Sequence, residues 1–204
     1  RREDGQFETL NNYFTIKSLK QMPHIAILSA SIRVGRNSHR VALYFKNYLE
    51  SGNLATVDIL DLKEYNFPLF DERLQFQKDP SPGTLEFAEK IKSSDAVLIV
   101  TPEYNGGYPA SLKNAIDLLY VEWYHKPVAI ATVSDGVFGG SQVITALQFT
   151  LWKMKAFTVP AMFPVPKVKD AFNENGDPTD KMATDKRALI FVNELLFCIE
   201  ANSK

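Results

Sequence analysis

Cysteine is nearly absent from this chain, which has Cys198 alone among its 204 residues. An internal disulfide and a metal cluster built on several thiolates are therefore excluded. Long hydrophobic runs are also missing: the aliphatic run over residues 96–100 is far shorter than the roughly 20 apolar residues that cross a bilayer. Neither charge sign dominates, because 23 Lys and Arg stand against 24 Asp and Glu, for a net charge of −1. We therefore expect a soluble, cytoplasmic protein without a nucleic-acid or membrane partner.

Metal-ligand spacing is missing as well, since the 3 histidines are scattered along the chain, and we expect no metal site. The first 21 residues are mostly polar and lack the apolar core of a secretory signal. The first strand-like run follows Met22. We expect residues 1–21 to be an N-terminal tail or extension and residues 22–204 to form one domain. The alternative for the first segment is an extra helix packed on that domain.

Short apolar runs alternate with segments of helical period from Met22 onward. The runs predict strands over residues 24–28, 55–60, 96–101, 127–133 and 158–162. The periodic segments predict helices over residues 38–51, from an N-cap at Thr84, and over 109–120, 141–157 and 182–201. This alternation predicts an α/β, flavodoxin-like three-layer sandwich, with a five-stranded parallel sheet of order 2-1-3-4-5 and helices on both faces. In that fold a ligand lies beyond the carboxyl ends of the strands, between the first strand and the third.

The loop after the first predicted strand (loop 1, residues 29–38) has the side chains that bind a phosphate. It combines hydroxyls, an amide and two guanidinium groups at the start of a helix, where backbone N–H groups are free. The residues are Ser29, Ser31, Arg33, Arg36, Asn37 and Ser38. The loop lacks the glycine pattern of a dinucleotide site and the Gly-Lys-Ser/Thr of a nucleotide triphosphatase. It therefore favours a monophosphate, with an ordinary solvated turn capped by Ser38 as the alternative.

Two further loops have compositions that allow close backbone approach to a flat ligand. The loop after the third strand (loop 2, residues 101–109) offers Pro102, Glu103, Tyr104, Asn105 and Gly106. The loop after the fourth strand (loop 3, residues 134–141) offers Ser134, Asp135, Gly136 and Gly139. Each could be a purely structural turn. Their coincidence with loop 1 at one edge of the sheet favours a phosphorylated planar ring, which is the shape of FMN.

Two stretches resemble the NADPH-dependent FMN reductase family, the flavodoxin-like group that includes quinone, azo and chromate reductases. Residues 102–117, PEYNGGYPASLKNAID, are similar to the family's PEYN…P…LKN…D signature, and Ser31-Ile32-Arg33 is similar to its Ser-x-Arg phosphate loop. Arg36 stands where a serine is common in the family. The likeness extends from about residue 23 to about residue 201.

The resemblance implies that FMN is held non-covalently, near a subunit interface of a homodimer or homotetramer. It assigns the FMN phosphate to loop 1, the isoalloxazine ring to loop 2 and the closing side to loop 3. Position by position these residues are Ser31, Arg33, Arg36, Asn37 and Ser38, then Pro102, Glu103, Tyr104, Asn105 and Gly106, then Ser134 and Gly136.

The implied function is that of an FMN-dependent NAD(P)H oxidoreductase, which passes hydride to a small acceptor such as a quinone, an azo compound, a flavin or a metal oxyanion. We expect ping-pong kinetics and no catalytic side chain, because the flavin carries the chemistry. Arg33 and Arg36 favour NADPH over NADH as co-substrate. A flavodoxin-type electron carrier and an inactive scaffold are the alternatives, and the arginines of loop 1 and the near-zero net charge favour the enzyme.

Overall fold

The computed structural model describes residues 21–203, and within them the sheet has five parallel strands in the order β2-β1-β3-β4-β5. This is the predicted flavodoxin-like topology. The strands are β1 (His24–Ser29), β2 (Thr56–Asp61), β3 (Ala96–Pro102), β4 (Pro127–Val133) and β5 (Phe157–Val165). Because all five are parallel, their carboxyl ends lie at one edge of the sheet.

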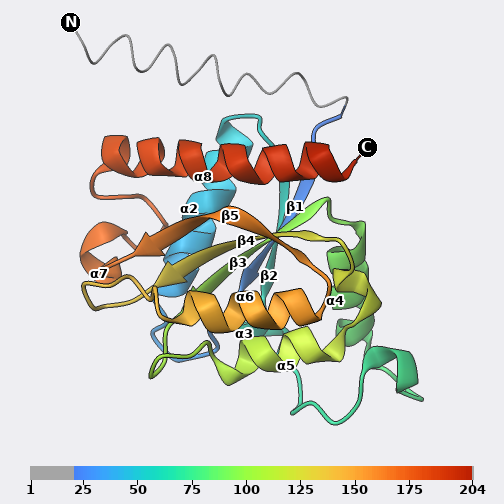
Figure 1. Ribbon diagram of the computed structural model, residues 1–204. Helices are drawn as coiled ribbons and strands as arrows, with labels where there is room; N and C mark the ends of the chain where they lie inside the picture. The colour runs from blue at the N-terminus through green and yellow to red at the C-terminus, as the bar shows by residue number, and fades with distance from the viewer. Residues whose placement is uncertain (1–20, 204) are drawn as a thin grey trace, which may run out of the picture.

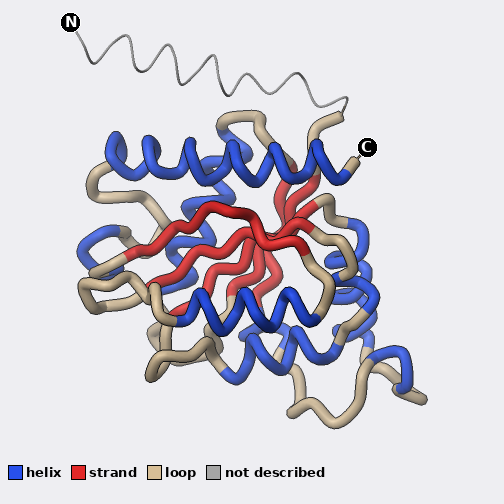
Figure 2. Tube along the Cα trace, viewed as in Figure 1, coloured by secondary structure: helices blue, strands red, loops and turns tan. Residues whose placement is uncertain are grey.

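Helices cover both faces of the sheet, as the strands of Figure 2 and the labels of Figure 1 show. The long helices are α2 (Ser38–Ser51), α4 (Pro82–Ser93), α5 (Ala110–Leu118), α6 (Val143–Lys153) and α8 (Lys181–Asn202). The shorter ones are α3 (Leu62–Tyr65), η1 (Leu74–Phe76), η2 (Val121–Trp123) and α7 (Val168–Ala171). α2 and α8 pack on one face, and α4, α5 and α6 on the other.

The central strand β3 is buried along its whole length, which explains its continuous run of apolar residues. Its side chains alternate between two cores. Leu98 and Val100 pack with Phe45 of α2 and Phe191 of α8, whereas Ile99 packs against α4, α5 and α6. The sheet is thus fixed from both sides, so the loops at its carboxyl edge start from a rigid platform.

Several boundaries differ from those that the sequence predicts. α6 ends at Lys153, whereas the predicted helix extends to residue 157, where β5 already begins. α4 begins at Pro82 rather than after an N-cap at Thr84: Ser81 is the N-cap, and its Oγ accepts a hydrogen bond from the Thr84 N–H at 3.1 Å. A proline suits the first turn of a helix, because the missing N–H has no partner there. β5 is longer than predicted, and its register with β4 shifts between Val128 and Ile130. Prolines are tolerated in this strand because it lies at the sheet edge.

The structure does not test the predicted tail, since residues 1–20 lie outside the described residues. Among residues 21–203, no helix combines the length and apolarity needed to span a membrane.

Candidate functional site

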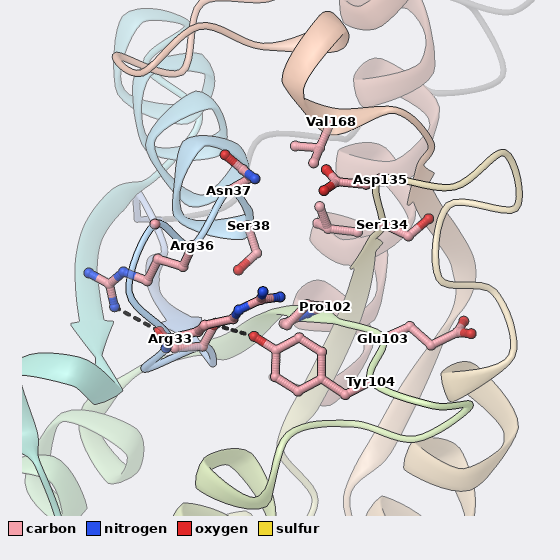
Figure 3. A pocket seen from close by; sticks show the side chains of 13 residues that line it. Arg33, Arg36, Asn37, Ser38, Pro102, Glu103, Tyr104, Ser134, Asp135 and Val168 are labelled. Atoms are coloured by element: carbon pink, nitrogen blue, oxygen red, sulfur yellow. Dashed lines mark hydrogen bonds between the residues drawn. The ribbon is translucent and has the colours of Figure 1, made fainter.

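A recess of about 190 Å³ opens at the carboxyl edge of the sheet, where loops 1, 2 and 3 meet (Figure 3). A fourth segment, at the start of α7, closes one side of it. The lining residues are Ser31, Arg33, Gly35, Arg36, Asn37, Ser38, Pro102, Glu103, Tyr104, Val133, Ser134, Asp135 and Val168. A more open recess of about 430 Å³ adjoins it, lined by Arg33, Glu103, Tyr104 and Asn105. We call the first, more enclosed recess the closed recess and the second one the open shelf.

The first turn of α2 supplies the most informative polar group of the recess. Ser38 is only 2% exposed, and its Oγ has no hydrogen-bond partner among the residues that the structure describes. Asn37 stands at the N-cap of α2 without forming a side-chain cap. A buried hydroxyl without a partner costs about 1–3 kcal/mol, so such a group in a pocket indicates a ligand that completes it. The free N–H groups of the same helix turn favour an anionic ligand.

Arg33 supplies the positive charge of the site. Its side chain is exposed and lines both the closed recess and the open shelf. None of the ion pairs found within residues 21–203 involves it. Figure 3 shows its guanidinium end directed over the recess. Arg33 is therefore available to a negatively charged group of a ligand.

Arg36, in contrast, does not direct its charge into the recess. Both of its terminal nitrogens donate to the carboxylate of Asp61, and Nη1 also donates to the Ser31 carbonyl oxygen at 2.8 Å. Figure 3 shows the guanidinium turned away from Ser38 and Tyr104. The Arg36 guanidinium is thus already bound by described partners, although the residue lines the recess.

Loop 2 turns sharply because two successive residues take the left-handed conformation. Asn105 has φ +52° and Gly106 φ +80°. Tyr104 and Gly107 exchange backbone hydrogen bonds of 2.8 and 3.0 Å across them. Asn-Gly is the residue pair that such a turn favours. The turn exposes the Tyr104 ring at the recess, where its hydroxyl shares a 2.7 Å hydrogen bond with Ser31 Oγ of loop 1.

Loop 3 is fixed by contacts to loop 2 and to β5. The Gln142 N–H, at the start of α6, donates to Glu103 Oε2 at 3.2 Å. Gly139 has φ +62°, and a Cβ there would lie 3.0 Å from Pro164 Cβ and from the backbone nitrogens of Val165 and Pro166. Close packing against β5 therefore requires this glycine. Gly139 does not line the closed recess.

The structure places ten of the fifteen residues expected at the ligand on the wall of the closed recess. The other five are Ser29, Asn105, Gly106, Gly136 and Gly139. Asn105 lines the open shelf instead. Ser29 is fully buried, and its Oγ is 3.0 Å from His39 Nδ1, behind loop 1. Ser29 therefore packs beneath loop 1, on the side away from the recess, where it contacts His39.

Three lining residues were not expected from the sequence: Gly35 of loop 1, and Val133 and Val168, which add an apolar side to the recess. Val168 begins α7, and its N–H donates to the Ser134 carbonyl oxygen at 3.2 Å. The predicted strand order contained a signal for Val168: because β5 neighbours β4, the loop that follows β5 must lie beside loop 3. Asp135 lines the recess too, but its carboxylate pairs with Lys169 at 3.2 Å.

His39, in the first turn of α2, has a perturbed ionisation. Burial lowers the pKa of its imidazole below the ordinary value of 6.5, and Arg36 acts in the same direction, while Asp61 opposes them. The imidazole therefore tends to be neutral behind loop 1 at neutral pH, and the positive charge at the recess comes from Arg33.

Comparisons of the sequence and of the fold with known proteins agree with one another. Residues 23–170 match the sequence model of the family described as NADPH-dependent FMN reductase. The NAD(P)H-dependent FMN reductase LOT6 of Saccharomyces cerevisiae is 32% identical over 144 residues, which cover 64% of this chain and 74% of that protein. A quinone reductase of Pseudomonas putida is 32% identical over 171 residues, covering 80% and 88%. Among solved structures, FerB, a flavoenzyme NAD(P)H:(acceptor) oxidoreductase from Paracoccus denitrificans, superposes with a TM-score of 0.70 at 25% identity, over 89% of this chain and 99% of that one.

Proposed function

The chain belongs to the NADPH-dependent FMN reductase family, and from this premise we propose that it is an FMN-dependent NAD(P)H oxidoreductase acting on a small acceptor such as a quinone. FMN, when bound, supplies a group that accepts hydride from the nicotinamide and passes it to the acceptor. The residues of this chain bind that group, orient it and leave one of its sides open.

The observation that carries the proposal is the hydroxyl of Ser38, which has no partner within residues 21–203. It is buried, lines the recess and lies in the first turn of α2, beside free backbone N–H groups. A phosphate monoester fits these donors, since it is an anion with several acceptor oxygens. We assign the phosphate to Ser38, Asn37 and the loop 1 backbone, with Arg33 as the counter-charge.

We assign the flavin ring to the open shelf beside loop 2. Tyr104 offers an aromatic surface there, and the Glu103 carboxylate is held by the Gln142 N–H. Loop 3 would close the other side through Ser134 and Gly136. The shelf is the more open of the two recesses, which supports a site where a nicotinamide and an acceptor bind in turn. We propose ping-pong kinetics, in which the oxidised nicotinamide leaves before the acceptor binds.

We further propose that the enzyme is a homodimer or homotetramer of the cytoplasm. Large apolar side chains of the loops around the site reach into solvent, as for Val34 (88% exposed) and Phe138 (74% exposed), and a second subunit would cover them. Light scattering on the purified protein gives the oligomeric state, and a fluorescent fusion gives the compartment. A monomer would contradict the first part and a membrane-bound fusion the second.

The direct test is a visible spectrum of the protein reconstituted with FMN, followed by anaerobic titration with NADPH. We expect a bound flavin spectrum that NADPH bleaches and that a quinone restores. A protein that ignores FMN would exclude the proposal and leave only a scaffold. A bound flavin that NADPH cannot bleach would favour the flavodoxin-type carrier instead.

A further inference from the structure

Asp61 is a buried carboxylate directly behind loop 1. It is the last residue of β2, lies opposite Ser29 of β1 in the sheet and is 4% exposed. Its carboxylate accepts from both terminal nitrogens of Arg36 and from the Lys63 N–H at 3.0 Å, and Oδ2 is 3.6 Å from His39 Nδ1. Asp61 does not line the recess. It therefore has no direct route to a ligand there.

Arg36 connects this carboxylate to the loop that lines the recess. While paired with Asp61, its Nη1 donates to the Ser31 carbonyl oxygen at 2.8 Å. Ser31 Oγ in turn accepts from the Arg33 N–H at 3.3 Å and shares a hydrogen bond with the Tyr104 hydroxyl. One chain of bonds thus runs from β2 through loop 1 to loop 2.

We propose that Asp61 is a positioning residue for phosphate binding, and that Arg36 acts on the phosphate through Asp61 and Ser31 rather than by touching it. This inference rests on the proposed function, because the phosphate is that of FMN. A planar guanidinium that engages a carboxylate with both nitrogens fixes direction as well as distance. Both side chains are largely buried, so removing either one leaves an uncompensated charge beneath loop 1. Holding the loop in its binding conformation beforehand lowers the entropic cost of binding.

The test compares FMN with riboflavin, which has the same ring but no phosphate. We expect Asp61→Asn, which is isosteric and keeps an acceptor for Lys63, to weaken FMN binding to the apoprotein by roughly tenfold. Riboflavin affinity stays unchanged, with both dissociation constants measured by flavin fluorescence. Asp58→Asn is the matched control: it lies on the same strand, its side chain is 40% exposed, and it pairs with His24 and Lys90 instead. It should leave both affinities unchanged.

Two outcomes of this experiment overturn the inference. If Arg36 contacts the phosphate directly, freeing it from Asp61 leaves FMN affinity unchanged or raises it, and either outcome overturns the inference. An equal loss for riboflavin overturns it as well, since it indicates general damage to the pocket.

Arg36→Lys gives a second reading, which also covers the case in which Asp61→Asn does not fold. Lysine keeps the charge but not the paired geometry, so we expect the same selective loss of FMN affinity. Unchanged FMN affinity in Arg36→Lys overturns the inference. If the unsubstituted protein binds neither flavin, the proposed function fails and the inference fails with it. Normal FMN binding in both variants overturns the inference alone.

Discussion

At the scale of single residues, Ser38 links local structure to ligand chemistry. Its hydroxyl is buried and has no partner in the part of the chain that the structure describes. It therefore destabilises the ligand-free fold and becomes favourable only when a ligand pairs with it. A residue that served packing alone would stabilise the ligand-free fold and contribute nothing to ligand binding. The two states of the protein should therefore respond differently to its removal.

We predict that Ser38→Ala leaves the stability of the apoprotein unchanged or raises it slightly, while FMN affinity falls by roughly five- to tenfold. Thermal unfolding with and without FMN, together with a fluorescence titration, measures both effects. Equal destabilisation of the two forms would show that the hydroxyl serves the fold rather than the ligand.

Arg33 differs from Arg36 in being unpaired within the described part of the chain and in lining the open shelf. Because Arg33 lines the open shelf as well as the closed recess, it is also the residue of loop 1 that a 2′-phosphate of NADPH could reach, besides its proposed role as counter-charge to FMN. We predict that Arg33→Ala lowers kcat/KM for NADPH about tenfold more than kcat/KM for NADH. Steady-state kinetics with both nicotinamides checks this. An unchanged ratio of the two values would place the recognition of the 2′-phosphate elsewhere.

His39 makes the stability of the fold decrease as the pH falls below 6.5. Burial lowers its pKa below 6.5 in the folded protein, so the unfolded chain binds more protons between the lowered pKa and 6.5. The contribution to stability is complete above pH 6.5 and is lost as the pH falls through 6.5 toward the folded pKa. We predict that His39→Gln flattens this part of the urea-unfolding midpoint plotted against pH. Parallel curves for the two proteins would refute the prediction.

The sequence predicts which residue types gather at the recess, but not all of their partners. Ser31, Asn37 and Ser38 follow from their place between a strand and a helix. The partner of Arg36 does not, because Asp61 lies on another strand and comes close only through the pairing of β1 with β2. Residue type alone gives Arg36 a phosphate contact. The pairing of β1 with β2 instead brings the carboxylate of Asp61 to the Arg36 guanidinium.

At the scale of elements, each loop owes its path to a different cause. An ion pair holds loop 1 against β2. The path of loop 2 is set by its Asn105-Gly106 turn, and that of loop 3 by the packing of Gly139 on β5. Strand and helix order could be predicted, because apolar periodicity reports burial directly. The full length of β5 could not, because Pro164 suggests the start of a loop until the strand is known to lie at the edge.

We predict that Gly139→Ala lowers the free energy of unfolding by about 2–4 kcal/mol, from backbone crowding and a strained positive φ. Gly136→Ala is the matched control in the same loop, because its Cβ would come no closer than 3.8 Å, to Ser134 Oγ. Urea unfolding of the apoproteins measures the difference. Similar losses in the two variants would mean that the close approach of loop 3 to β5 does not decide its path.

At the scale of the whole molecule, the packed sheet and the binding recess are separate parts of the fold. Two cores fix the sheet from both faces. The buried Ser38 hydroxyl, which has no partner among the described residues, lies at the carboxyl edge of the sheet, where four segments meet. This edge joins a closed recess suited to a phosphate and an open shelf suited to a flat ring. The central claim is that one ligand, FMN, fills both.

A crystal structure of the protein with FMN tests that claim most directly. We predict the phosphate within hydrogen-bond distance of Ser38 Oγ and the first turn of α2, with the ring on the shelf beside Tyr104 and the Arg36–Asp61 pair intact beneath loop 1. A phosphate bound away from α2, or a ring outside the three loops, would contradict it.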